Sequence, residues 1–333
     1  MSSPTSIPSL SWADTAVPSG QSWDGSFRSM ASRVNVSLGP GTTRPELLFA
    51  EIGSVFAQVE AECTRFDRTS DLMRANAATD EWCRVGSYCY RALEEAAHAH
   101  QFTGGLFDPR VLSTLQQLGY VHSLPFAAGR VEVSAPEGRA SSQPATHAPW
   151  QLATDPAERS VRIGPIPVDL GGIGKGLAVR WALERAAQHS PSLLIEAGGD
   201  CFLRGMSPDG AAWQVGVEDP QGGDKPIAVL ALSDLACATS SIRLRQWRVD
   251  GATVHHLIDP RTGTPGGTGI LAVTVVARDP AEAEVWSKVL FLQGMNGIVA
   301  TAERLGLAAL WAGADGSLAM SSTMHPFVIW TAS

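Results

Sequence analysis

The sequence lacks long apolar stretches: its uninterrupted apolar runs are short pieces such as residues 227–232. A membrane-spanning helix needs roughly 18 such residues, so a membrane span is excluded. Basic residues are missing before Arg28 and cysteines before Cys63, so the N-terminus has neither the charged region of a secretory signal nor an early cysteine for lipid attachment. These absences predict a cytoplasmic protein.

Cysteine and positive charge are both scarce. The five cysteines form an odd number without a CxxC pair, which favours reduced thiols over a disulfide framework or a zinc site. The 33 acidic residues exceed the 25 basic ones, which leaves a formal net charge of -8. A broad contact with a phosphate backbone needs the opposite balance, so DNA and RNA are excluded as expected partners.

The chain is long enough for a sizeable core, with 333 residues of which 44% are hydrophobic. Its 33 glycines and 21 prolines show no period, which predicts many turns between short elements. Residues 1–26 are rich in Ser and Pro and have no apolar periodicity, so we expect a loosely ordered tail. We expect residues 27–333 to form a single domain, with a loop excursion near residues 127–149.

Apolar spacing predicts an α+β protein with largely antiparallel sheets. Helical periodicity covers residues 45–66 and 87–100, and further helices are expected from residue 174 and over residues 280–294. Strand-like runs occupy residues 193–196, 213–218, 227–232, 253–258 and 270–277. Strands outnumber the helices that could connect parallel neighbours, which disfavours a doubly wound parallel sheet.

The segment 169–176 (DLGGIGKG) has the composition of an anion site. A strand-like run enters a glycine-rich turn and then a helix, where backbone N–H groups, the helix N-terminus and Lys175 all favour negative charge. It is not a P-loop, because Asp169 stands where that motif has Gly and Gly176 where it has Ser or Thr. It is not a dinucleotide fingerprint either, because Leu177 replaces the last Gly or Ala. A tight turn without a ligand is the alternative.

The segment 255–263 (HHLIDPRTG) is a strand that ends in a polar turn. His256 is suited to act as a general base near neutral pH, and Arg261 is suited to bind phosphate. The segment could therefore complete a phosphoryl-transfer site. Alternatively, Asp259 and Arg261 stabilise the turn and His256 is merely packed.

Several rarer motifs occur in a fixed order between residues 28 and 318. They are RFD at 65–67 with Ser70 and Asn76, GGLFDP at 104–109, the segment 169–176, EAGGD at 196–200, ATS at 238–240 and HLIDPRTG at 256–263. In this the chain resembles the FAD:protein FMN transferases, the ApbE-like flavin transferases. The resemblance implies their fold and the transfer of FMN from FAD to a Ser or Thr hydroxyl of an acceptor flavoprotein, with release of AMP.

The resemblance also implies a set of site residues. The FAD-binding positions would be Met30, Phe66, Gly105, Leu106, Phe107, Asp169, Lys175 and Ile258. Lys175 would hold the pyrophosphate, and His256 or Asp259 would take the proton of the acceptor hydroxyl. Without the family context, the apolar residues Met30, Phe66, Phe107 and Ile258 could be core positions. Asp67, Asp108 and Asp200 of the same motifs could be turn or cap residues. A partner's loop must reach the site, so we expect an open cleft.

The family's magnesium site is where this sequence departs from the pattern. The family holds Mg²⁺ with a backbone carbonyl of the glycine-rich turn, here Gly172, and with an Asp and a Thr four residues apart on a later helix. Those two positions are Glu284 and Lys288 here, with Ser287 beside them. A protonated lysine has no lone pair for a metal. Lys288 could replace the ion, the ion could bind Gly172, Glu284 and Ser287 alone, or transfer could be lost; an ordinary surface Glu–Lys pair is a further alternative.

Two other functions fit the same residues. A non-catalytic FAD-binding protein would keep the FAD cradle after losing the metal. An FAD pyrophosphatase would use water in place of the acceptor hydroxyl and would release FMN and AMP. Neither of these two functions would attach FMN to an acceptor protein, whereas a transferase would.

Overall fold

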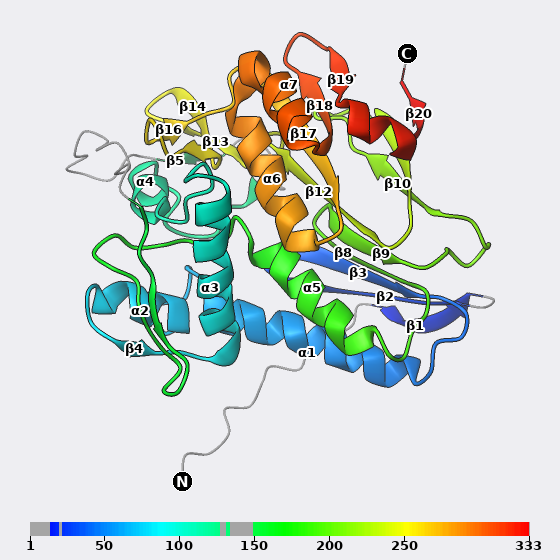
Figure 1. Cartoon of the computed structure of the whole chain (residues 1–333), viewed down its shortest axis with the longest axis horizontal. Coiled ribbons are helices and arrows are strands. Elements are labelled where there is room, and N and C mark those ends of the chain that lie inside the picture. Colours follow the sequence, from blue (N-terminus) through cyan, green and yellow to red (C-terminus); the bar gives the residue numbers. More distant parts are fainter. Residues whose placement is uncertain (1–13, 20–21, 127–130, 134–148, 333) are drawn as a thin grey trace.

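The computed structural model describes residues 14–19, 22–126, 131–133 and 149–332. Its centre is a sheet of nine strands in the order β1-β2-β3-β8-β9-β12-β17-β18-β19, in which every neighbouring pair is antiparallel (Figure 1). The strands are β1 Asp14–Ser19, β2 Ser22–Ser29, β3 Ser32–Leu38, β8 Leu193–Ala197, β9 Asp200–Arg204, β12 Leu235–Ser241, β17 Ile270–Ala277, β18 Ala308–Gly313 and β19 Leu318–Met320.

Smaller sheets surround the central one. They are formed by β10 Trp213–Val217 with β11 Ala228–Leu232 and β20 Val328–Thr331; by β5 Glu132–Val133 with β13 Gln246–Val249 and β14 Ala252–His255; by β15 Ile258–Asp259 with β16 Thr264–Pro265; and by β4 Cys83–Arg84 with β7 Ser160–Arg162 and β6 Ala153–Asp155. In the described part of the chain only β5 and β13 pair in parallel. The α+β class with largely antiparallel sheets is thus confirmed.

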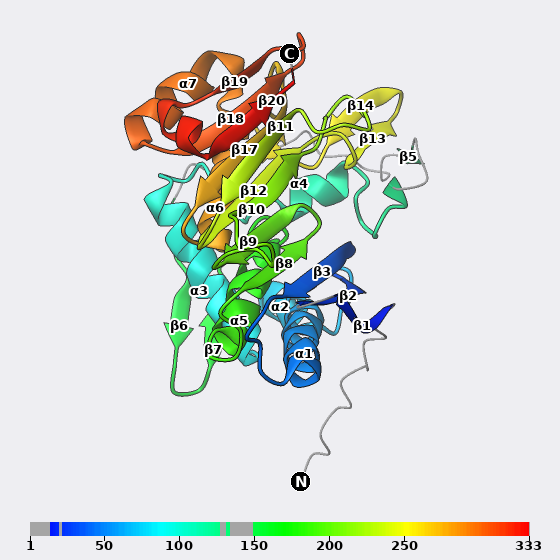
Figure 2. The same ribbon diagram turned by 90° about the vertical axis from the view of Figure 1, so that its right-hand side faces the viewer.

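Helices cover one face of the large sheet, and the β10-β11-β20 sheet packs against the other (Figure 2). The helices are α1 Pro45–Cys63, α2 Asp71–Ala78, α3 Ser87–Phe102, α4 Leu112–Gln117, α5 Gly174–Ala186, α6 Pro280–Leu292 and α7 Gly294–Leu305, and a 3₁₀ helix, η2, spans Ser322–Phe327. Strand β9 shows the consequence of two covered faces: Phe202 packs toward the helices, whereas Cys201 and Leu203 pack toward the small sheet. Residues 200–203 of this strand are therefore buried on both faces.

Local sequence explains the helices that position the site. In α1, Leu48, Ile52, Val55 and Val59 recur at helical spacing and are all buried, as the periodicity predicts. Helix α6 begins after Asp279, whose carboxylate accepts hydrogen bonds from the N–H groups of residues 281 and 282, at 2.9 and 3.0 Å.

Several expected boundaries differ in the structure. Residues 14–19 and 22–26 are not a loose tail, because β1 and β2 pair with each other and β2 pairs with β3. Residues 1–13 and 20–21 of the expected tail lie outside the described residues. The strand expected over 253–258 is split, because β14 ends at His255 and Ile258 belongs to β15. Of the loop excursion, residues 127–130 and 134–148 lie outside the described residues, while β5 lies within it. The single-domain organisation stays a prediction.

All five cysteines are free. None of the helices in the described part of the chain combines the length and the apolar character of a membrane span. The cytoplasmic location is untested by the fold and stays a prediction.

Candidate active site

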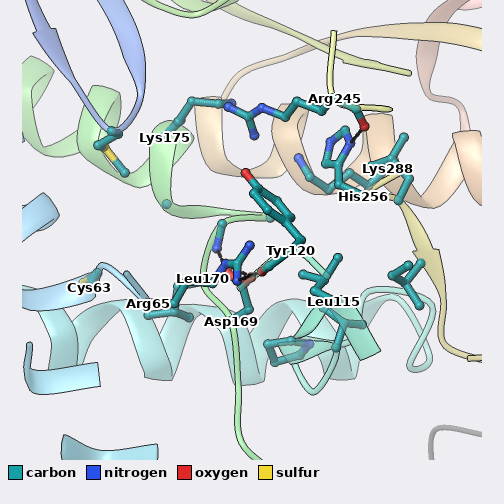
Figure 3. Close-up of a pocket in the computed structure, with 18 of the residues that line it drawn as sticks. Cys63, Arg65, Leu115, Tyr120, Asp169, Leu170, Lys175, Arg245, His256 and Lys288 are labelled. Carbon is teal, nitrogen blue, oxygen red and sulfur yellow. Dashed lines mark hydrogen bonds and ion pairs between the residues drawn. The ribbon is translucent and has the colours of Figure 1, made fainter. Parts of the chain in front are cut away.

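A cavity of about 410 Å³ lies where the glycine-rich turn before α5 meets the ends of α1 and α6 (Figure 3). This volume is typical of small-molecule sites. Ten of the residues singled out from the sequence line it: Met30, Phe66, Leu106, Phe107, Asp169, Gly172, Lys175, His256, Ile258 and Lys288. The fold therefore brings together residues from distant parts of the chain.

The glycine-rich turn is held by Asp169. Its backbone N–H donates to the carbonyl of Pro109 at 2.7 Å, and its carboxylate accepts the N–H of Gly171 at 2.6 Å. The other carboxylate oxygen pairs with Nε of Arg65 at 3.0 Å. Asp169 thus shapes the turn with both oxygens, and the first residues of α5 follow directly, with Lys175 facing the cavity.

A buried charge cluster forms one end of the site. Lys175 pairs with Asp200 and with Glu284 Oε1, the latter at 3.0 Å, and the second oxygen of Glu284 accepts the N–H of Gly176 at 2.8 Å. Lys288 donates to Glu284 Oε1 at 3.2 Å. Burial lowers the pKa of Lys175 to about 8. Burial opposes the charge of Glu284, but the two lysines hold the pKa of that carboxyl below its ordinary value.

The residues expected at a magnesium site do not fit the ion. Both oxygens of Glu284 are already hydrogen-bonded, and its side chain is 1% exposed. Ser287 is bonded to Ser240 Oγ at 2.7 Å and donates to the carbonyl of residue 284 at 2.9 Å. Among the described residues, no three His, Cys, Asp or Glu side chains are grouped to hold a metal. The alternative of an exposed surface Glu–Lys pair is wrong, because the pair is buried.

His256 is oriented by a backbone carbonyl. Its Nδ1 lies 3.2 Å from the carbonyl oxygen of Arg245, which can only accept, so Nδ1 carries the proton and Nε2 has a free lone pair. Burial, together with the nearby cations Arg245 and Lys288, lowers the pKa of His256 well below its ordinary value. The imidazole is therefore neutral, and the tautomer set by Arg245 leaves its Nε2 as the acceptor atom.

Two arginines and a tyrosine of the site were not assigned from the sequence. The guanidinium of Arg65 lies 4.3 Å from the ring centre of Phe66 and 4.2 Å from that of Tyr120. Its Nη1 donates to the Tyr120 carbonyl at 2.7 Å, while its buried Nη2 has no partner in the described part of the chain. Arg245 also lines the cavity. The RFD motif marks the position of Arg65, whereas no local pattern marks Tyr120 or Arg245.

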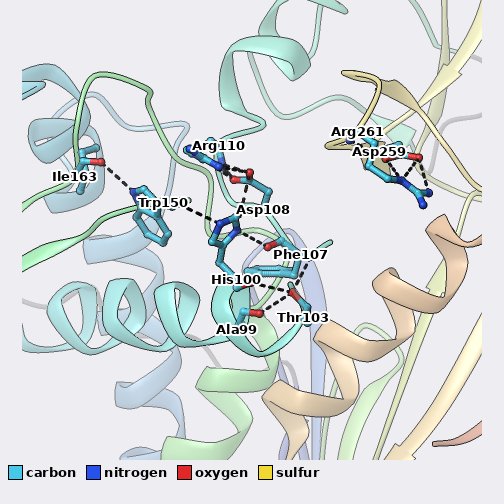
Figure 4. A network of polar contacts seen from close by, with 10 residues as sticks. All are labelled: Ala99, His100, Thr103, Phe107, Asp108, Arg110, Trp150, Ile163, Asp259 and Arg261. Carbon is cyan, nitrogen blue, oxygen red and sulfur yellow. Dashed lines mark hydrogen bonds and ion pairs between the residues drawn. The ribbon is translucent and has the colours of Figure 1, made fainter. Parts of the chain in front are cut away.

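The loop 104–109 is held by His100 (Figure 4). His100 Nδ1 donates to the carbonyl of Phe107 at 3.0 Å, and the N–H of Phe107 donates to Thr103 Oγ1, also at 3.0 Å. Gly105 has a φ of +83° and donates its N–H to the carbonyl of His100 at 2.8 Å. Gly105 lines a neighbouring cavity instead of the first one, and it turns the loop that presents Leu106 and Phe107. Its contact with FAD stays a prediction.

Asp259 differs from the expectation of a proton acceptor. Its two oxygens bind Nε and Nη2 of Arg261 at 2.9 and 2.8 Å, and one also accepts the N–H of Arg261 at 2.9 Å (Figure 4). It does not line the cavity that contains His256. Asp259 and Arg261 thus stabilise the turn, as the alternative interpretation of this segment expected, because the arginine binds both carboxylate oxygens.

Comparisons with known proteins point to one family. Residues 30–311 match the model of the ApbE family. The FAD:protein FMN transferase of Chlamydia trachomatis is 29% identical over 247 residues, 72% of this chain and 74% of that protein. The transferase of Haemophilus influenzae is 26% identical over 288 residues, 80% of this chain and 78% of that protein.

Solved structures show the same architecture. The crystal structure of the ApbE protein from Thermotoga maritima matches with a TM-score of 0.80 and 26% identity, over 92% of this chain and 99% of that one. The flavin transferase ApbE from Vibrio cholerae has the same fold, with a TM-score of 0.77, 23% identity and the same coverage. With the family model matching most of its length, the chain belongs to the ApbE family.

Proposed function

We propose that the chain is an FAD:protein FMN transferase, which moves FMN from FAD to a Ser or Thr hydroxyl of an acceptor flavoprotein and releases AMP. The observation that carries the proposal is the meeting of Lys175, Arg245 and Lys288 around neutral His256 in one cavity (Figure 3). Three cations suit a pyrophosphate, and a neutral imidazole suits a hydroxyl proton. The relatives named above carry the same activity in their names.

FAD would lie along the cavity from its basic end to its apolar end. The pyrophosphate would contact Lys175 at the start of α5, where the helix N-terminus adds positive potential. The ring systems of FAD would find apolar and aromatic surface in the remaining lining, which includes Met30, Phe66, Leu106, Phe107, Tyr120 and Ile258. Nη2 of Arg65, which has no partner among the described residues, would give a ligand one further hydrogen-bond donor.

The transfer step uses His256 as the base. The acceptor hydroxyl oxygen forms a bond to the FMN phosphorus, and the bond from that phosphorus to the bridging oxygen breaks. AMP leaves with the bridging oxygen and the electron pair. The hydroxyl proton goes to Nε2 of His256, while Nδ1 stays bonded to the carbonyl of Arg245. Lys175 and Arg245 offset the charge that develops on the phosphate oxygens.

The proposal is tested by weighing an acceptor protein. Purified chain, FAD and a flavoprotein domain that an active family member labels are incubated, and the acceptor is analysed by mass spectrometry. Addition of one FMN mass, abolished by changing the acceptor Ser or Thr to Ala, is the expected result. Release of FMN and AMP without any labelled acceptor would replace the proposal with an FAD pyrophosphatase, and FAD binding without turnover would replace it with a binding protein.

A further inference from the structure

Lys288 occupies the space between the glycine-rich turn and α6. A Cβ placed on Gly172 would meet the Cδ and Cε atoms of Lys288 at 3.6 Å, and Nζ of Lys288 reaches Oε1 of Glu284 at 3.2 Å. We propose that Lys288 is a built-in cation that binds the FAD pyrophosphate, so that FAD binding and flavin transfer by this chain require no divalent metal. The inference deepens the proposed function and rests on it.

The ammonium of Lys288 retains a donor for a ligand. Within the described residues it forms two hydrogen bonds, to the backbone carbonyl of Glu284 at 3.3 Å and to its carboxylate at 3.2 Å. An ammonium has three N–H groups, so one remains. Lys288 lines the cavity and its side chain is 16% exposed, so this third donor can meet a phosphate oxygen.

The surrounding charges favour a monovalent cation here. The two carboxylates of the cluster, Asp200 and Glu284, already face the two ammonium groups of Lys175 and Lys288. A divalent ion would enter a cluster that is already neutral, beside the further cation Arg245, without an open carboxylate oxygen on Glu284. A ligand pyrophosphate supplies the negative charge that this arrangement lacks.

Lysine is rare in this chain. Only three of the 25 basic residues are lysines, at positions 175, 225 and 288, and two of these three line the cavity. Lysine carries a compact point charge, whereas the planar guanidinium of arginine is larger. A compact charge fits the narrow space between Gly172 and Glu284.

The first test measures FAD binding, which needs no acceptor. Quenching of flavin fluorescence gives the Kd of FAD and of riboflavin, which has the same ring but no phosphate, in excess EDTA and in Mg²⁺. We expect the Kd of FAD to differ less than twofold between EDTA and Mg²⁺. We expect Lys288→Met to weaken FAD binding at least tenfold while changing riboflavin binding less than twofold.

Lys225→Met is the matched control, because Lys225 is an exposed lysine that does not line the cavity. It should bind both flavins as the unchanged protein does. Equal unfolding temperatures of Lys288→Met and the unchanged protein would show that the fold is kept, and Lys288→Thr provides a second, smaller replacement. The proposal is overturned if Lys288→Met binds FAD normally, or if the unchanged protein gains tenfold or more in FAD affinity from Mg²⁺.

The second test measures transfer. The initial rate of FMN addition to the acceptor in EDTA should be within twofold of that in Mg²⁺, and Lys288→Thr should lose at least tenfold in EDTA. If transfer by the unchanged protein stops in EDTA and returns with Mg²⁺, the proposal that Lys288 replaces the ion is overturned, but the transferase activity is not. Absence of transfer in all conditions contradicts the transferase, while the binding experiment still decides the role of Lys288.

Discussion

At the scale of single residues, the two candidate proton acceptors of the HLIDPRTG segment, His256 and Asp259, point to different surroundings. His256 faces the cavity with a free Nε2, whereas Asp259 is held by Arg261 outside it. The sequence places both in one polar segment and leaves the proton acceptor undecided. The path of the chain between β14 and β15 directs the two side chains to different surroundings, which favours His256 as the proposed base.

His256→Ala should therefore lower the rate of FMN transfer by roughly 10²-fold or more, the usual effect of removing a general base. The Kd of FAD should change less than threefold, because the cations proposed to hold the pyrophosphate remain. Single-turnover labelling and a fluorescence titration measure the two quantities, and His122→Ala, on an exposed residue outside the cavity, is the control. A transfer rate within tenfold of normal would show that another group takes the proton.

At the scale of elements, the site depends on the close approach of α5 and α6. Gly176 donates its N–H to Glu284 at 2.8 Å. A Cβ on Gly176 would lie 2.5 Å from the carbonyl oxygen of Pro280 and 2.6 Å from Cα of Ala281. Both are backbone atoms, so the two helices can approach this closely only with glycine here. The glycine-rich segment thus serves helix packing as well as the proposed anion binding.

Gly176→Ala should lower the free energy of unfolding by about 1–3 kcal/mol, because the added methyl pushes α5 from α6. Alanine gains about 1 kcal/mol in helix propensity, which does not offset the clash. Gly297→Ala in α7 is the control, since its Cβ would contact only the Gln293 side chain, at 3.3 Å. Urea midpoints of the two variants compare the effects, and a Gly176→Ala variant as stable as Gly297→Ala would disprove the packing argument.

At the scale of the whole molecule, two adjacent histidines make the fold sensitive to acid. Burial lowers the pKa of His255 to about 4, and burial together with the nearby Arg245 and Lys288 lowers the pKa of His256 well below its ordinary value. An unfolded histidine binds a proton near pH 6.5, whereas the folded ones do not. The unfolded state then binds more protons, so stability falls as the pH drops from about 6.5 toward 4.

His255 should contribute about 1–2 kcal/mol to this loss by pH 5. In the structure the N–H of Leu257 donates to His255 Nδ1 at 3.3 Å. The variant His255→Asn keeps an acceptor for this N–H but has no imidazole to bind a proton. Its unfolding temperature should fall less between pH 7 and pH 5 than that of the unchanged protein. The control His122→Asn changes an exposed residue, so its unfolding temperature should fall as much as that of the unchanged protein. An equal fall in both variants would show that His255 does not cause the loss of stability.

Local periodicity determined much of the architecture. The apolar spacing of residues 45–66 and 87–100 predicted α1 and α3, and the alternation of short apolar runs predicted the antiparallel strands. These features follow from residues a few positions apart, because helix and strand periods are short. The ordered motifs likewise indicated the ApbE family, because each motif is contiguous in the chain.

Only the tertiary structure decided how the charged side chains pair. Spacing placed Glu284 and Lys288 on one face of a helix, but burial against α5 made them part of a four-charge cluster with Lys175 and Asp200. Arg245 reaches the same cavity from a segment without a local pattern. Such contacts join residues tens to more than a hundred positions apart, so they depend on chain topology and burial, which no local spacing encodes.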